Sequence, residues 1–132
     1  LLLVSSLNQL QVKCRNLYLN QGVQDTRGFH CDGRSLKFKS FVYISDVNKL
    51  DDGPYCYVKG SHRHRRLWRN NSKFNKENQL DPFEFSQLQG SQAISVFAQA
   101  GDMVISSQKG AHCGHPQHAE AKRAVLVNMY QR

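Results

Sequence analysis

The fold class is decided by the run Phe38-Lys39-Ser40-Phe41-Val42-Tyr43-Ile44-Ser45-Asp46-Val47. It is rich in β-branched and aromatic residues, which favour extended backbone. Side chains alternate between the two faces of a strand, so Phe41 and Tyr43 share one face while Val42 and Ile44 share the other. Both faces carry bulky apolar groups, and we therefore expect this strand to lie in the centre of a sheet.

Similar short runs recur on both sides of this strand, separated by Gly, Asp, Asn and Pro. The predicted strands are residues 12–20, 28–32, 38–47, 55–59, 93–98, 102–106 and 123–130. Turn signals at 51–54 and 100–102 mark corners between them. This pattern is typical of an all-β fold, a barrel or sandwich of the jelly-roll kind. We expect only two short helices, one from Ser61 as N-cap to about Asn70 and one beginning at residues 81–84.

Length and composition point to one domain over residues 1–132. The chain has 39% hydrophobic residues and a net charge of +8, which argues against disorder and against a fibrous repeat. The apolar run at 1–4 is far too short to span a membrane, and no charged segment precedes it as in a signal peptide. We therefore expect a cytoplasmic protein. Because the chain begins with Leu1, the absence of some N-terminal structure stays open.

Four cysteines are spread along the chain: Cys14, Cys31, Cys56 and Cys113. None forms a C-x-x-C pair, the spacing of zinc knuckles and of redox motifs. Reduced thiols are the expectation for a cytoplasmic protein.

Nearly all of the net positive charge lies between residues 59 and 76. This segment holds seven Lys or Arg residues, two histidines, one tryptophan and no acidic residue. One interpretation is a binding surface for phosphate, nucleic acid or another anion, because clustered cations beside an aromatic ring suit such ligands. A second is a solvated loop that only aids solubility, and a third is the steering of an anionic small substrate.

The motif Phe29-His30-Cys31-Asp32-Gly33 carries the first candidate chemistry. On a strand, His30 and Asp32 would point to the same face. A histidine and a carboxylate on one face supply two of the three ligands of a facial triad for non-haem iron(II). The pair alone is common, and a surface histidine beside a turn aspartate is the alternative.

Candidates for the third ligand follow the predicted strand 102–106, where His112 and His115 lie close together in sequence. Arg123 stands at the beginning of the apolar final strand. A cation that enters a β-core needs an anionic partner, and a dicarboxylate co-substrate would supply one. The alternatives for Arg123 are a pair with a nearby acid or a path to solvent.

Taken in order, these motifs resemble the phytanoyl-CoA dioxygenase family of iron(II)- and 2-oxoglutarate-dependent oxygenases. The motifs are His30-x-Asp32, the strand residues 41–47, the turn 52–54, the segment 57–62, Gly101-Asp102, His112-x-Gly114 and Arg123. The resemblance covers about residues 29–130, and it implies a double-stranded β-helix, or jelly roll, with iron at one mouth. This agrees with the all-β interpretation reached from the strand pattern.

The resemblance implies His30, Asp32 and His112 as the iron ligands and Arg123 as the partner of the distal carboxylate of 2-oxoglutarate. The step from His112 to Arg123 and the following Gly114 favour His112 over His115. The implied reaction uses dioxygen, converts 2-oxoglutarate to succinate and hydroxylates a small organic substrate, which the basic segment suggests is anionic. Nucleic acid is not the expected substrate. The remaining histidines, His62, His64 and His118, are expected to be solvated or structural.

The chain departs from the family at two points. Some members have a hydroxyl residue where Gly114 stands, and most have more N-terminal structure. Asn16, Tyr18 and Asn20 share one face of the first predicted strand and could replace some of the missing contacts. Two alternatives therefore stay open: a non-catalytic module that binds an anion through the basic segment, and a degenerate oxygenase fragment that binds metal.

Overall fold

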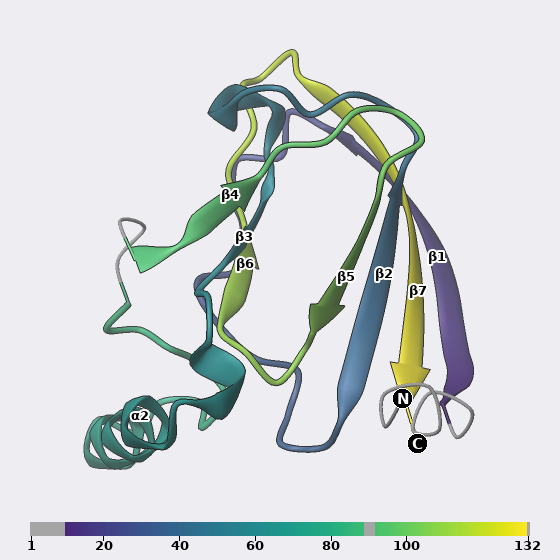
Figure 1. Cartoon of the computed structure of the whole chain (residues 1–132). Coiled ribbons are helices and arrows are strands. Elements are labelled where there is room, and N and C mark those ends of the chain that lie inside the picture. Colours follow the sequence, from purple (N-terminus) through teal and green to yellow (C-terminus); the bar gives the residue numbers. More distant parts are fainter. Residues whose placement is uncertain (1–9, 89–91, 132) are drawn as a thin grey trace.

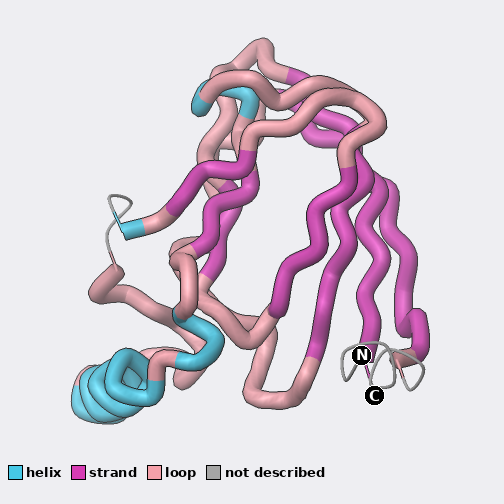
Figure 2. Tube along the Cα trace, viewed as in Figure 1, coloured by secondary structure: helices cyan, strands magenta, loops and turns pink. Residues whose placement is uncertain are grey.

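Two antiparallel sheets face each other in the computed structural model, which describes residues 10–88 and 92–131 (Figures 1 and 2). The elements in chain order are β1 (Gln11–Gln21), β2 (Lys37–Tyr43), η1 (Leu50–Asp52), β3 (Tyr55–Tyr57), η2 (Ser61–Arg63), α2 (Arg65–Glu77), β4 (Ile94–Val96), β5 (Met103–Ser107), β6 (His112–Gly114) and β7 (Lys122–Gln131). The fold is mainly β and of the jelly-roll type, as the strand pattern predicted. None of the described helices has the length and apolar character needed to cross a membrane.

The larger sheet has the strand order β1-β7-β2-β5, so β2 lies between two neighbours as predicted. Its inward residues Phe41 and Tyr43 stand opposite Val127 and Val125 of β7. Tyr43 and both valines are buried in the core between the sheets. The apolar alternation of β2 and β7 therefore forms one wall of the interior.

β2 ends at Tyr43 rather than at the predicted Val47. The backbone N–H groups of Ile44 and Ser45 both donate to the carbonyl of Ala124, which ends the regular ladder. Val47 instead forms an isolated bridge with Ala98. The end of the apolar run thus ties the loop after β2 to the loop after β4.

The smaller sheet has the order β4-β3-β6, and its strand β6 was not predicted. Conversely, the predicted strand 28–32 is wrong, since only His30 of this segment forms bridges, to Glu84 and His112. The neighbouring N–H groups of Cys31 and Asp32 donate to Phe83 and Gln108, respectively. Because successive hydrogen bonds lead to three different parts of the chain, no continuous ladder forms.

The first predicted helix is present but begins later than expected. Ser61 opens the short η2, and α2 begins at Arg65 with the side chain of His64 as its cap, accepting from the Leu67 N–H at 3.0 Å. The Ser61 hydroxyl is used elsewhere, accepting from the Ala111 N–H at 2.8 Å.

The second predicted helix, at residues 81–84, is wrong. The Asp81 carboxylate accepts from the Phe83 N–H at 2.7 Å and closes a single turn. The Phe85 N–H then donates to the carbonyl of Phe29, which draws the chain into extended pairing. A long-range hydrogen bond therefore overrides a local helix-start signal.

Helix α2 is attached to the body by buried amides and by a small apolar cluster. Asn71 and Asn75 are buried, and each donates to the carbonyl of Glu84, at 2.6 and 2.7 Å. Leu67 and Trp68 pack against the buried cluster of Cys31, Phe85 and Ala111. This cluster lies next in sequence to both halves of the predicted metal site.

Candidate metal and co-substrate site

A pair of backbone hydrogen bonds brings the two halves of the candidate metal site together. The His30 N–H donates to the carbonyl of His112, and the His112 N–H donates to the carbonyl of His30, both at 2.9 Å. The imidazole centroids are 4.5 Å apart. Each Nε2 atom lies 3.7 Å from Oδ1 of Asp32. One candidate ligand atom from each of the three residues therefore lies within 4.8 Å of the others.

Both imidazoles are oriented by their second nitrogen. Nδ1 of His30 lies 2.7 Å from the carbonyl of Gly28, and Nδ1 of His112 lies 2.9 Å from the carbonyl of Gly110. A carbonyl can only accept, so Nδ1 carries the proton in each ring. The Nε2 atom of each ring therefore faces the Asp32 carboxylate, and orientation through the other ring nitrogen is the arrangement that metal-binding histidines adopt.

The Asp32 carboxylate divides its two oxygens between the histidines and a lysine. Oδ1 faces His30 and His112, whereas Oδ2 forms an ion pair with Nζ of Lys39 at 2.6 Å. Burial opposes ionisation of Asp32, but its interactions with His112 and Lys39 outweigh this and hold its pKa well below the usual range. Burial also lowers the pKa of His30 and so favours the neutral ring that binds a metal. The three donors therefore suit a divalent cation.

Lys39 was not among the predicted site residues. It lies on the inward face of β2, two positions before Phe41. The signal that could have found it is the strand alternation itself, because a lysine on the apolar face of a central strand needs a buried anion.

Arg123 lies at the beginning of β7, where it stands opposite Asn20 of β1. Its guanidinium donates to the carbonyl of Gly53 and, at 3.2 Å, to Oδ1 of Asn20. Its Nε is buried without a hydrogen-bond partner, and no acidic group of residues 10–88 or 92–131 forms an ion pair with Arg123. Burial lowers its pKa, but a guanidinium stays charged in proteins. The cation is therefore left with unused capacity for an anion.

One cavity of about 290 Å³ is lined by Arg123 and by His30 and His112, the two histidines of the candidate metal site. We call it the metal cavity. Its wall includes His30, His112, Lys39, Arg123 and Tyr18, together with Phe41, Tyr43, Tyr55, Gln108, Cys113, Gly114, Val125 and Val127. Most of these residues come from β2 and β7 of the larger sheet and β6 of the smaller one, so the cavity lies between the two sheets. A ligand that binds the metal could therefore also reach the guanidinium.

Two further polar residues in this wall were not predicted. The hydroxyl of Tyr55 lies 2.9 Å from Oγ of Ser106 and accepts from Nε2 of Gln108 at 3.4 Å. Oε1 of Gln108 is buried and has no hydrogen-bond partner in the described part of the chain. Burial raises the pKa of Tyr55 well above its usual range, so its hydroxyl stays protonated. Neither residue stands in a sequence motif, and only the packing of β3 against the end of β5 places them here.

The structure places the other candidate histidines outside the triad. His115 is not a member of the cluster, since its backbone N–H donates to Pro54 and its Nδ1 to the carbonyl of Pro116. His118 is exposed, with Nδ1 accepting from the Glu120 N–H. His62 lies beside the Tyr57 hydroxyl, and His64 caps α2.

Two of the three polar residues expected to contribute to the site from the first strand lie at the cavity or contact Arg123. Tyr18 lines the metal cavity and Asn20 contacts Arg123, whereas Asn16 is exposed. Gly114 also lines the cavity, and position 114 therefore contributes no hydroxyl group to the wall. The four cysteines are free, as expected, although Cys56 and Cys113 stand directly opposite each other on β3 and β6.

Comparison with models of protein families and with curated proteins finds no match. Solved structures do match. The chain is similar to HygX from Streptomyces hygroscopicus with nickel and 2-oxoglutarate bound, at 17% identity and a TM-score of 0.69, over 92% of this chain and 56% of HygX. It is similar to HygX with nickel, 2-oxoglutarate and hygromycin B bound, at 19% identity and a TM-score of 0.64, over 98% of this chain and 61% of HygX.

A third similar structure is the nickel complex of the non-heme monooxygenase ThoJ, at 18% identity and a TM-score of 0.64. That match covers 92% of this chain and 44% of ThoJ. This chain thus spans less than two thirds of the length of each of these proteins. At such low identity the matches establish a shared jelly-roll fold, and the narrower resemblance to phytanoyl-CoA dioxygenases stays a prediction.

Proposed function

We propose that this chain forms the core of an iron(II)- and 2-oxoglutarate-dependent oxygenase that hydroxylates a small organic substrate. One observation carries the proposal. His30 and His112, which form the candidate triad with Asp32, line the same cavity as Arg123, a half-buried cation that has no acidic partner among the described residues. HygX, which shares the fold, has been crystallised with iron and with nickel and 2-oxoglutarate.

The residues present fit iron(II). Two imidazoles and one carboxylate form the donor set of the facial triad, which leaves positions open for other ligands. The carbonyls of Gly28 and Gly110 hold the imidazoles in the required tautomer, and Lys39 holds the second oxygen of Asp32. Iron(II) and 2-oxoglutarate, once bound, would supply the oxidation of a C–H bond by dioxygen, with release of succinate and carbon dioxide.

The residues around Arg123 fit the distal carboxylate of 2-oxoglutarate. The unpartnered Nε–H of Arg123 is a donor to an anion, and a charge-assisted bond there would satisfy it. Asn20 and Gly53 already fix the two terminal nitrogens, so the guanidinium is held in place before the ligand arrives. Because Gly114 offers no hydroxyl, Arg123 is the main side chain that this chain presents to that carboxylate.

The apolar wall of the metal cavity has a separate role. Phe41, Tyr43, Val125 and Val127 surround the reaction space and exclude water from it. The substrate would be a small molecule, and the positive surface near residues 59–76 favours an anionic one. HygX has been crystallised with a small molecule, hygromycin B, which supports this size class.

The proposal is tested by anaerobic titration with iron(II) and then 2-oxoglutarate, followed by visible absorption. We expect the weak charge-transfer band of a chelated keto acid in the unaltered protein and in His118→Ala. We expect no band in Asp32→Ala and a weaker one in Arg123→Met. A band that persists unchanged in Asp32→Ala would falsify the assignment of the triad.

A second candidate rests on the triad of His30, Asp32 and His112 alone. It is a metal-binding jelly roll without turnover. Iron binding without the charge-transfer band, and without succinate formation, would favour this candidate over the oxygenase.

A further inference from the structure

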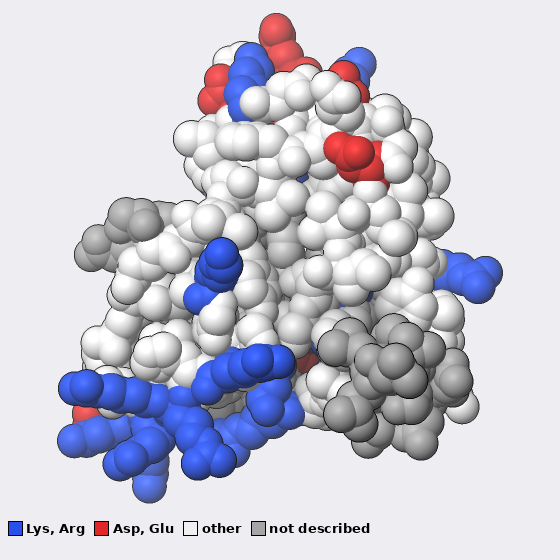
Figure 3. Space-filling model, viewed as in Figure 1, with Lys and Arg blue, Asp and Glu red and all other residues white. Residues whose placement is uncertain are grey.

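A cavity of about 870 Å³ lies along α2 and is about three times as large as the metal cavity. We call it the α2 cavity. Six cationic side chains line it: Arg34, Arg63, Arg65, Arg69, Lys73 and Lys109. No Asp or Glu is among its lining residues in the described part of the chain. The space-filling view shows the corresponding concentration of Lys and Arg at one end of the molecule (Figure 3).

These cations have almost no partners within the protein. In residues 10–88 and 92–131, no ion pair or side-chain hydrogen bond involves any of the four arginines or Lys109. Lys73 lies 3.9 Å from Glu77, but both side chains are largely exposed. By contrast, Arg27 and Lys39 each have a close carboxylate. Cations gathered around a concave surface without counter-charges raise the local potential and attract anions.

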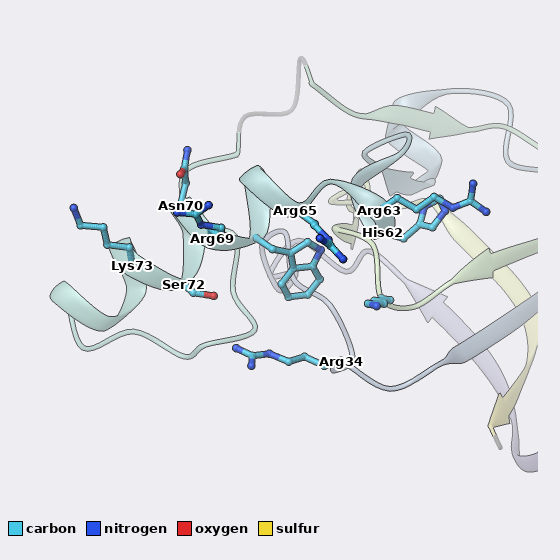
Figure 4. Close-up of a pocket in the computed structure, with 10 residues that line it drawn as sticks. Arg34, His62, Arg63, Arg65, Arg69, Asn70, Ser72 and Lys73 are labelled. Carbon is cyan, nitrogen blue, oxygen red and sulfur yellow. The ribbon is translucent and has the colours of Figure 1, made fainter.

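The geometry of α2 directs this charge to one side. Arg65, Arg69 and Lys73 follow one another at intervals of four residues, so they share a helix face. Like charges at that spacing destabilise a helix. Asn71 and Asn75 attach the helix to the body through the Glu84 carbonyl, which leaves the cationic face toward the cavity. The close-up shows these labelled side chains on α2, with Arg34 approaching from a separate segment (Figure 4).

The lining chemistry favours phosphate. Four of the six cations are arginines, whose planar guanidinium forms paired hydrogen bonds with phosphate oxygens. Trp68 adds a fixed aromatic wall, because its Nε1–H donates to the Ser61 carbonyl at 3.1 Å and its ring packs edge-on against Phe85 at 5.0 Å. A concave space of this size suits a compact ligand rather than an extended polymer.

We propose that the α2 cavity is a binding site for a compact oligophosphate, a ligand with two or more linked phosphate groups. Three separate segments provide the cations: the loop after Asp32, the turn before β6, and the stretch from η2 into α2. Together they can surround several phosphates at once. The site is distinct from the metal cavity, because the residues that line the two cavities do not overlap.

The test is titration of the whole chain with inorganic tripolyphosphate, without added divalent cation. Trp68 is the only tryptophan, so its fluorescence reports on the α2 cavity directly. We expect a saturable change in fluorescence and one-to-one binding by calorimetry. In the double variant Arg65→Gln/Arg69→Gln, affinity should fall by about tenfold or more, as expected when charge-assisted bonds to a phosphate are removed.

The matched control is Arg66→Gln/Lys76→Gln, which removes the same charge from the same helix at positions that do not line the cavity. Its affinity should stay within about twofold of the unaltered protein, since only distant, screened charges change. If the α2 double variant does not fold, Arg34→Gln/Lys109→Gln makes the same test from the two loops. Asp32→Ala should leave tripolyphosphate binding unchanged, which separates this inference from the proposed oxygenase.

Three outcomes would overturn the proposal: no saturable binding, equal losses in the cavity and control variants, or binding of single-stranded oligonucleotides only. A nucleoside triphosphate compared with tripolyphosphate identifies the carrier of the phosphates. Tighter binding of the nucleotide supports a contact of its base with Trp68, and equal binding supports recognition of the phosphates alone. Both results support the oligophosphate site.

Discussion

The metal cavity and the α2 cavity differ in whether their charged side chains have partners. In the metal cavity, Asp32, Lys39 and Arg123 are at least partly buried, and each is held by named partners. In the α2 cavity, six cations share one space and have almost no partners among the residues that the structure describes. Groups that must act on a bound molecule with fixed geometry need orientation by the protein, whereas a charged surface can hold an anion through the sum of its field. The two regions therefore suit different tasks.

The largest expected effect is the loss of iron(II) affinity on substitution of Asp32. Asp32→Ala removes a candidate metal ligand and leaves Lys39 without its carboxylate. Substitution of residues that only hydrogen-bond to metal ligands typically lowers metal affinity by about 10–100-fold. For Asp32→Ala we therefore expect iron(II) affinity to fall by more than about a hundredfold. Calorimetry with iron(II) under anaerobic conditions measures it, and His118→Ala serves as the control. Metal affinity within about threefold of the unaltered protein would contradict the triad.

The next effect concerns the co-substrate. Arg123→Met should weaken 2-oxoglutarate binding to the iron-loaded protein by about a hundredfold, because charge-assisted hydrogen bonds are lost from a buried site. Iron affinity itself should stay unchanged, and thermal denaturation checks the fold. The control is Arg15→Met, an exposed arginine on β1. An equal loss in both variants would mean that Arg123 does not bind the co-substrate.

A smaller effect is expected at Lys39, which positions Asp32 and is not itself a candidate ligand. Lys39→Met removes the ion pair to Oδ2 of Asp32 and should lower iron affinity by about 10–100-fold without abolishing binding. Lys39→Arg should restore most of the affinity, because it restores the charge. Lys13→Met, at an exposed lysine of β1, is the control for the loss of charge. Failure of Lys39→Arg to recover affinity would indicate that packing rather than charge is the contribution of Lys39.

Salt concentration is expected to affect binding in the two cavities differently. Raising the salt concentration from about 0.05 to about 0.5 M shortens the screening length and should weaken tripolyphosphate binding by about tenfold. Binding of iron(II) should change by less than about twofold, because its ligands are coordinated at short range and partly buried. Parallel titrations at both concentrations make the measurement. If salt weakened tripolyphosphate and iron(II) binding equally, the α2 cavity would not differ from the metal cavity in its dependence on long-range electrostatic attraction.

The smallest expected effect lies at the beginning of α2. His64→Ala removes the side chain that caps the Leu67 N–H and should lower the free energy of unfolding by about 0.5–1 kcal/mol. Chemical denaturation measures it, with His118→Ala as the control. If α2 carries the phosphate ligand, saturating tripolyphosphate should raise the unfolding midpoint of both variants.

Much of the fold could be predicted because the signal is local. The β2 alternation of Phe41 and Tyr43 predicts an inward face, and the structure has both residues in the interior. The segment 28–32 and the helix at 81–84 were wrong for one reason. In both, backbone groups pair with distant segments, and these pairs, such as Phe85 with Phe29, override local preferences.

The candidate site shows the same division. His30, Asp32, His112 and Arg123 were found as residue types at suggestive spacing. The structure brings His30, His112 and Arg123 to one cavity and places Asp32 beside the two histidines. Lys39, Tyr55 and Gln108 were missed, since they stand in no motif. Their contribution depends on the register of β2, β3 and β5 and on which side chains meet across the interior.

The sequence by itself determined the all-β class, the inward face of the central strand, the cationic segment and the residues able to bind a metal. These follow from alternation, composition and side-chain chemistry, which need no knowledge of the partner. Only the tertiary structure decided that His30 and His112 exchange backbone hydrogen bonds, that Lys39 holds Asp32 and that six cations surround one cavity. Each of these depends on segments far apart in the chain, and their meeting is fixed by the packing of two sheets and a helix.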